Sequence, residues 1–366
     1  MARTNYTTGS NETVKRWNRY LFAESIQRTT YARFIVEGDN KSSGLITLLT
    51  DLQKDSGDRI RSTLLAQLTG DGIVGDTPQL RGNEESLTTF TDDINIDLLA
   101  HAVDIGGKMS RQRVVYDVKA EAVNRLADWA ADRMDTVFFN HLCGFTAETR
   151  TAYNANNTIV APDSAHILRA GASNTTDQAV GADTAALFDL PLIDRCIAAA
   201  KTFGKGGNPI APAYIPELGG RYYVMFVHPD QVTNLYGSTY ANGFSAIQRA
   251  IAAGQEIAKN PIFTDVLGVY RNTLLVEAPR ITRGVHSTTG ASVANSRRAV
   301  FAGAQAAAIA FAGDYNDGSN IFSTIEQNDD YDRLKGVGLE TIYGLKKMRF
   351  NSADFASIAV TTYTSV

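Results

Sequence analysis

The chain has 366 residues, 44% hydrophobic and 20% charged, a composition that indicates a folded protein and excludes a disordered one. Its net charge of −4 excludes a nucleic-acid-binding polycation. Cys143 and Cys196 lack metal-ligand spacing, which argues against a disulfide scaffold or structural zinc and favours a reducing compartment. No apolar run approaches the roughly 20 residues of a membrane span, and the N-terminus lacks the apolar core of a signal peptide. We therefore expect synthesis on the cytosolic side and no membrane partner.

The first segment of the chain is polar and basic. Residues 1–34 hold six Lys or Arg residues against two Glu, with aromatic residues interspersed. Such a segment has too little apolar surface to form a core alone, so we expect an arm that lies on another surface. The stretch GLITLLTDLQK at residues 44–54 has helical apolar spacing and predicts a short helix within residues 41–55.

Residues 57–104 predict a long two-stranded finger. The stretch 59–68 is strand-like, and 90–98 alternates apolar and polar residues. A Gly-, Asp- and Pro-rich stretch lies between them. Because two isolated strands expose one whole face and are marginal in water, we expect this finger to lie against an adjacent copy of the chain.

Residues 112–142 predict a long amphipathic helix, with Ser110 as N-cap and Gly144 as the stop. At ~1.5 Å per residue it would form a rod of roughly 46 Å. A second helix is expected from residue 190 to 203, capped by Asp189, and a third at 229–236. Strands are expected at 222–228, 267–277, 299–311, 339–350 and 358–363, and a further helix at 244–253. The fold class is α+β.

We find no pattern that predicts catalysis. No glycine motif matches a phosphate-binding loop, and no nucleophile motif is present. His141 and Cys143 are two residues apart, which points them to different faces of a helix. His228, before a proline, is interpreted as a structural histidine. The acidic run Glu326, Asp329, Asp330 and Asp332 lacks the order of a calcium loop, so no enzyme activity, cofactor or metal is expected.

Several blocks resemble the phage major capsid protein family typified by coliphage N four, which has an HK97-like capsid fold. They include LTGDGIVGD at 68–76, LRGNEESL at 80–87 and GKMSRQR at 107–113. Others are NPIF at 260–263, LGVYRNTLLVE at 267–277, VFAGAQAAAIAFAG at 300–313 and the C-terminal stretch from residue 328. Together they span residues 40–365 in order.

The resemblance implies a division of the chain. Residues 1–40 would be the N-terminal arm, 41–55 the short helix and 56–106 the extended E-loop hairpin. Residues 107–189 and 299–366 would form the peripheral domain, with the spine helix at 112–142, and residues 190–298 the axial domain. The implied function is that of a major capsid protein, which self-assembles into hexamers and pentamers of an icosahedral head around double-stranded DNA.

Candidate contact residues follow from the finger and the arm. E-loop contacts to a neighbouring subunit are assigned to Asp58, Arg59, Asp71, Asp76, Arg81, Glu84 and Glu85. Lys108, Arg111 and Arg113, at the start of the spine, are candidates to receive a neighbour's acidic tip. The arm contacts are Arg16, Trp17, Arg19 and Tyr20, which we expect on adjacent subunits in preference to DNA. The alternative is that these charges are ordinary surface residues, since an exposed ion pair contributes ~0–1 kcal/mol.

The expected partners are copies of the chain itself, together with portal, scaffolding and decoration proteins. Packaged double-stranded DNA would touch the inner face without sequence specificity. We expect the protein in the virion capsid, assembled in the host bacterial cytoplasm. Two alternative functions stay open at this point: an encapsulin-like compartment shell of the same fold, and a soluble α+β hydrolase with a site assembled from distant residues.

Overall fold

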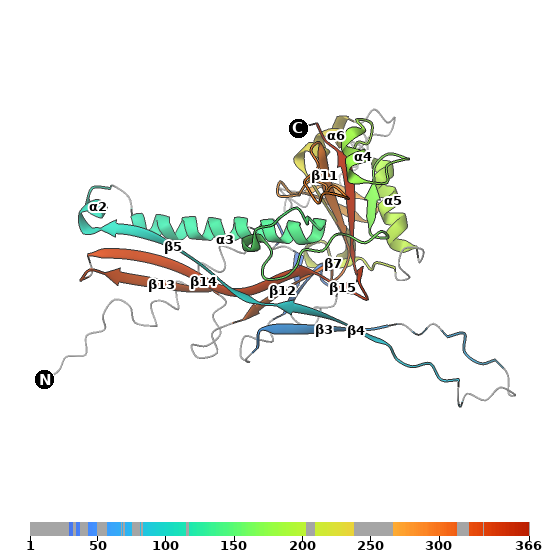
Figure 1. The fold of residues 1–366 in the computed structure, drawn as a ribbon, viewed down its shortest axis with the longest axis horizontal. Helices are drawn as coiled ribbons and strands as arrows, with labels where there is room; N and C mark the ends of the chain where they lie inside the picture. Colours follow the sequence, from blue (N-terminus) through green and yellow to red (C-terminus); the bar gives the residue numbers. More distant parts are fainter. Residues whose placement is uncertain are drawn as a thin grey trace.

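The computed structural model describes residues 29–31, 34–36, 43–49, 57–66, 68, 70–74, 81, 83–114, 117–202, 209–237, 266–312, 322–331 and 333–365. The molecule is elongated. A long helix lies along one sheet, a compact α/β unit stands on one end of that layer, and a hairpin projects past it (Figure 1).

The first sheet forms the long layer. Its strand order is β1 (Ile35–Val36), β2 (Ile46–Leu49), β12 (Ala307–Ala312), β14 (Leu334–Lys347) and β13 (Phe322–Asp329), and β5 (Asp97–Gly107) also pairs with β14. The β5–β14 and β13–β14 pairs are antiparallel, whereas β2 runs parallel to both β1 and β12. Side chains alternate along β14, and those on one face, including Val337 and Leu339, belong to the core that α3 covers.

Helix α3 (Val118–Cys143) is the predicted spine, but it begins later than expected. Asp117, and not Ser110, is the N-cap, because its carboxylate accepts hydrogen bonds from the amides of Lys119 and Ala120. The residues before it form the separate one-turn helix α2 (Lys108–Gln112). The C-terminus is as predicted, since Gly144 has the left-handed backbone (φ 62°) that ends helices.

The second sheet forms the compact unit. Its order is β6 (Ile167–Arg169), β17 (Ser357–Tyr363), β11 (Ser296–Ala302), β8 (Gly220–Val227), β10 (Thr273–Glu277) and β9 (Val266–Tyr270), with β7 (Ala213–Ile215) paired to β8. Helices α4 (Asp177–Ala182), α5 (Leu190–Lys201) and α6 (Pro229–Gly237) accompany it. Short elements are the 3-10 helices η4 (Thr151–Tyr153) and η5 (Pro216–Leu218), and the pair β15 (Arg349–Phe350) and β16 (Ala353–Asp354). Asp189 caps α5 as predicted, accepting from the amide of Leu192.

One sequence expectation needs correction, and the expected domain division stays a prediction. The helix predicted within residues 41–55 is wrong, because residues 46–49 form β2 and pair with strands on both sides. A short apolar run fits either element, and here pairing with two strands determines the outcome. In addition, β11 and β17 pair in the same sheet as β8 and β10, so the expected boundary at residue 299 crosses one sheet. The division into peripheral and axial domains stays a prediction, and the helix expected at 244–253 lies outside the described residues.

Strands β3 (Arg59–Leu65) and β4 (Thr89–Asn95) form the predicted hairpin, paired antiparallel from Arg59–Asn95 to Leu65–Thr89. The chain then continues through Ile96 into β5, which is part of the first sheet. The expectation that the whole stretch 57–104 is a finger that lies against an adjacent copy is therefore wrong for β5. Its side chains Leu99 and Val103 pack against the main core.

Candidate assembly surfaces

The base of the β3–β4 hairpin packs on its own chain. Ile60, Ile94 and Ile96 are buried in a second apolar cluster with the alanines of β12 and with Met348 and Phe350. This corrects the expectation of a finger wholly dependent on a neighbour. Only the part beyond the cluster projects from the body (Figure 1).

Polar contacts also fix the hairpin base. The ammonium group of Lys346 lies 2.6 Å from Asp92 Oδ1 and donates to the carbonyl of Asp93 at 2.9 Å. The buried side chain of Asn157 bonds both the amide and the carbonyl of Asn95, at 3.0 and 2.9 Å. These contacts hold the point where β4 passes into β5.

Gly344 allows the hairpin to cross the sheet at this point. A Cβ atom at Gly344 would overlap the carbonyl oxygen of Asn95. The backbone at Gly344 is not left-handed, so a close approach of main chain, and not a turn, requires the glycine here.

The predicted E-loop residues fall into two groups. Near the base, the carbonyl of Asp58 accepts from the amide of Ile96, and Arg59 pairs with Asp93 at 3.5 Å. Arg61, which was not predicted, binds Asp93 at 2.7 and 2.9 Å, and this hydrogen bond lowers the pKa of the Asp93 carboxyl. These residues interact within the hairpin itself.

The tip holds the remaining predicted residues. Asp71, Arg81, Glu84 and Glu85 are exposed, and Glu85 accepts from the amide of Gly70 at 2.8 Å. Asp76 lies outside the described residues. Large apolar side chains are exposed beside them, namely Leu65, Leu68, Val74 and Leu87. A surface with this many exposed apolar groups is typical of a binding interface.

Lys108, Arg111 and Arg113 lie at the opposite end of the molecule. The first two are in α2, none of whose residues is buried, and Arg113 follows directly. Helix α2 and the hairpin tip lie at the two ends of the long axis (Figure 1). Within one chain the structure therefore does not bring the acidic tip and these cations together.

The arm contacts Arg16, Trp17, Arg19 and Tyr20 lie outside the described residues. The root of the arm is built into the core. Thr30 donates three hydrogen bonds to the carboxylate of Asp135 on α3, and the buried Tyr31 stacks on Phe138 at 4.4 Å. Residues 30 and 31 are therefore held at a fixed point on α3.

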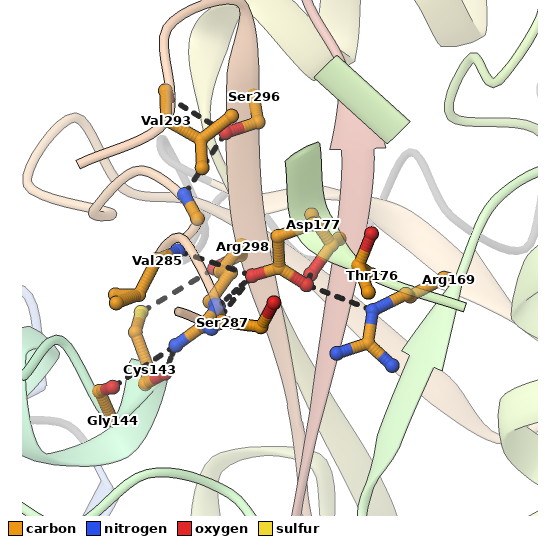
Figure 2. A network of polar contacts seen from close by, with 12 residues as sticks. Cys143, Gly144, Arg169, Thr176, Asp177, Val285, Ser287, Val293, Ser296 and Arg298 are labelled. Atoms are coloured by element: carbon orange, nitrogen blue, oxygen red, sulfur yellow. Dashed lines mark hydrogen bonds and ion pairs between the residues drawn. The ribbon is translucent and has the colours of Figure 1, made fainter. Parts of the chain in front are cut away.

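A buried ion pair, which the sequence did not predict, joins α3 to the second sheet (Figure 2). Arg298 on β11 lies 2.6 Å from Asp177 at the start of α4 and donates to the carbonyls of Cys143 and Gly144. Asp177 also accepts from Arg169 at 2.9 Å. Burial raises the pKa of Asp177, but the two arginines outweigh it and hold that pKa below its usual value.

The candidate catalytic groups have structural roles. Burial lowers the pKa of His141 to about 4, and its Nε2 donates to the carbonyl of Asn154 at 2.9 Å. Burial raises the pKa of Cys143, whose thiol donates to the carbonyl of Arg298, so the thiol stays protonated at neutral pH. His228 contacts Asp230 at 3.0 Å. Among the described residues no cluster of His, Cys, Asp and Glu could hold a metal, and no helix could cross a bilayer.

Comparison with known proteins gives a consistent result. Residues 5–366 match the model of a family described as phage capsid protein. The major capsid protein of Pseudomonas phage KPP25 is 27% identical over 98% of this chain and 96% of its own length. The solved capsid of Ralstonia phage GP4 has a TM-score of 0.75 at 30% identity, covering 91% of this chain and 90% of that one.

A more distant structure agrees in fold. The capsid of cyanophage Pam1 has a TM-score of 0.70 at 20% identity, with 93% of both chains covered. The predicted HK97-like α+β fold is therefore confirmed. The prediction of a structural protein of the virion capsid that associates with its own copies, and not an enzyme, is also confirmed. The chain belongs to the family of phage capsid proteins and is a major capsid protein that forms the phage head.

Proposed function

We propose that the chain assembles into hexamers and pentamers of an icosahedral head that encloses double-stranded DNA, and that it groups with the capsid proteins of coliphage N four. The grouping is supported by the sequence blocks at residues 80–87 and 107–113. The assembly is supported above all by one observation: a hairpin that projects from its own core with exposed apolar side chains.

The hairpin provides one half of the subunit contact. Asp71, Glu84 and Glu85 are exposed in the same part of the hairpin as the exposed Leu68 and Val74. The other half is the end that carries α2, where Lys108 and Arg111 accompany exposed Met109. Because the two surfaces differ and lie at opposite ends, contact between them is head-to-tail, and such contacts close into rings.

The other partners follow from charge and position. The basic arm, with Arg16, Trp17, Arg19 and Tyr20, would lie on adjacent subunits from its fixed root at Thr30. Portal, scaffolding and decoration proteins would bind the assembled shell, and DNA would contact its inner face through nonspecific charge.

Shortening the hairpin tests the proposal. Residues 67–87 would be replaced by a two-residue Asn-Gly turn, which keeps β3, β4 and the packed base. We expect a folded subunit by circular dichroism that forms no rings or shells by negative-stain electron microscopy and size-exclusion chromatography. The matched control is the substitution Arg125→Ser on the exposed side of α3, which should assemble normally. Normal shells from the shortened chain would refute the role of the hairpin.

A further inference from the structure

A polar cavity lies beside the base of the β3–β4 hairpin. Its volume is about 230 Å³, and its walls come from β4, the end of α3, the stretch after η4 and the chain from β14 to β16. Its hydrogen-bond donors include Thr91, Thr158, Lys346, Lys347, Arg349 and Ser352. None of the subunit contacts proposed above involves these residues, so the cavity has no role in them.

The cations of this cavity outnumber their carboxylate partners. Lys346 lies 2.6 Å from Asp92. Lys347 and Arg349 share one carboxylate, because Asp354 lies 2.7 Å from the ammonium group of Lys347 and 2.8 Å from Nε of Arg349. Among the described residues, three cations therefore have two carboxylates within hydrogen-bond distance, which leaves one positive charge in excess.

The carboxylate of Asp163 does not supply the missing charge. It accepts from the amide of Asp354 at 2.9 Å and contacts Nδ1 of His166 at 2.9 Å, and it does not line the cavity. Burial lowers the pKa of Lys347, and Asp354 opposes this shift without cancelling it. The low pKa of His141 results first from burial, and Lys347 and Lys346 lower it further. Both shifts agree with a cavity that is short of negative charge.

The side chain of Lys347 has donors that its own chain does not use. It is 2% exposed, so bulk water has little access to it. An ammonium group has three N–H donors, and Asp354 is the one hydrogen-bond partner of Lys347 among the described residues. Because buried donors are normally paired, the two remaining N–H groups require an acceptor in the cavity that Lys347 lines.

Arg349 and the neighbouring hydroxyl groups add further donors. Nε and Nη2 of Arg349 bind Asp354 and the carbonyl of Ser352, whereas Nη1 has no partner in the described part of the chain. The hydroxyl groups of Thr91, Thr158 and Ser352 are on the same lining. A carboxylate has only two oxygens to offer to these donors. A tetrahedral oxyanion has more, and phosphate forms strong charge-assisted hydrogen bonds with lysine and arginine.

We propose that the cavity binds a small anion of the phosphate class, held by Lys347 and Arg349, and that this anion fastens the hairpin base to the body of the subunit. The cavity admits an ion larger than one water molecule, whose share of liquid volume is ~30 Å³. Thr91 belongs to β4 of the hairpin, whereas Lys347 and Arg349 belong to β14 and β15. An anion between them contacts both parts, so its binding stabilises their association.

Two sources can supply this chemistry, namely free phosphate and the backbone of packaged DNA. The burial of Lys347 favours the free ion, because a phosphodiester in a polymer reaches a buried ammonium group less easily. The proposal does not depend on how the subunits assemble.

Isothermal titration calorimetry on the unassembled full-length chain tests the proposal. Inorganic phosphate, added at constant ionic strength in sodium chloride, should bind at one site per chain with a Kd of about 1 mM or tighter. Acetate should bind at least tenfold more weakly. Absence of phosphate binding, or equal affinity for acetate, would overturn the proposal. A short DNA duplex should not displace phosphate. Displacement would still support a phosphate site but would assign its source to DNA.

A charge placed at the cavity locates the bound ion. Ser352 is exposed and has a left-handed backbone (φ 62°), which aspartate tolerates. Ser352→Asp should therefore fold normally by circular dichroism and weaken phosphate binding at least tenfold. The matched control is Thr288→Asp, on an exposed loop that does not line the cavity, and it should keep the original affinity. Equal affinities in the two variants would place the ion elsewhere and refute the proposal.

Deuterium exchange measures the effect on the hairpin. Phosphate at twice its Kd should slow the exchange of β4 amides by about threefold, and amides of β13 should be unchanged. The slowing should be absent in Ser352→Asp. Phosphate binding without slower exchange in β4 would contradict the fastening of the hairpin base.

Discussion

The backbone amide of Thr30 donates to both carboxylate oxygens of Asp135, at 3.0 and 3.1 Å, and the Thr30 hydroxyl donates to Oδ2 at 2.9 Å. One carboxylate on α3 thus holds the start of the described chain. Tyr31 and Phe34 are buried in the main core, so the chain is anchored to α3 from residue 30 on.

Asp135 makes the stability of the subunit depend on pH. Burial raises the pKa of Asp135 to about 6, although the bonds from Thr30 oppose the shift. Since this pKa lies above the unfolded value of 3.8, the stabilising contribution of the protonated group is complete only well below pH 3.8 and is lost as pH rises through about 6.

The substitution Asp135→Asn removes this contribution. The free energy of unfolding of the wild type minus that of Asp135→Asn should decrease by about 2 kcal/mol between pH 4 and pH 7. Urea denaturation of the unassembled full-length chain measures it. His141 titrates with the opposite sign over this range and cancels in the difference. A difference that does not change with pH would contradict the assignment.

Breaking the buried pair between Asp177 and Arg298 should be costly. Asp177→Ala leaves a buried guanidinium without its carboxylate, and we expect a loss of about 3–5 kcal/mol in denaturant unfolding. The control is Asp194→Ala, which breaks the exposed pair with Arg271 and should cost about 0–1 kcal/mol. Similar losses in the two variants would show that burial does not increase the contribution of the Asp177–Arg298 pair to the free energy of unfolding.

Gly344 and Gly338 should respond differently to the same change. Gly344→Ala brings a methyl group against the carbonyl of Asn95, and we expect a loss of about 1–3 kcal/mol in subunit stability. Gly338→Ala should change that stability by less than about 0.5 kcal/mol, since a Cβ atom there would meet nothing closer than 3.7 Å. Equal losses of stability in the two variants would mean that the close approach of Asn95 to Gly344 is not required for the stability of the subunit.

Removing the charge of Lys346 should loosen the hairpin without unfolding the chain. In Lys346→Met the carboxylate of Asp92 loses its ammonium partner and keeps the backbone amide of Arg349, so amides of β3 and β4 should exchange with deuterium faster by about tenfold or more. Amides of β8 and β11, in the second sheet, serve as the internal reference and should be unchanged. If deuterium exchange in the hairpin did not change, apolar packing alone would be sufficient to hold the hairpin base in place.

The sequence predicted elements whose signals are local. Asp189 and Pro191 predicted the start of α5, and Gly144 predicted the end of α3. Both predictions were possible because a helix cap acts within one turn of the helix. The late start of α3 depended on whether Ser110 or Asp117 serves as the cap. Serine and aspartate are both favoured at the N-cap position, so the sequence alone does not distinguish Ser110 from Asp117.

Features that join distant residues could not be read from the sequence. Asp177 and Arg298 are 121 positions apart, and Asp92 and Lys346 are 254 apart. No spacing rule relates such pairs. Residues 46–49 became a strand because β1 and β12 lie on either side of them, which depends on tertiary pairing. The projecting hairpin was predictable because its composition and alternation are local, but its packed base was not.

The hairpin continues without a break into β5, which is antiparallel to β14 from Asp97–Tyr343 to Gly107–Leu334. A force that pulls the hairpin along the length of the sheet would therefore act as shear on the hydrogen bonds between β5 and β14. All of these bonds would bear the force at the same time. Strands pulled in this direction cannot separate one bond at a time. The subunit is thus built to resist tension along its long axis far better than a force that peels β5 away from its end.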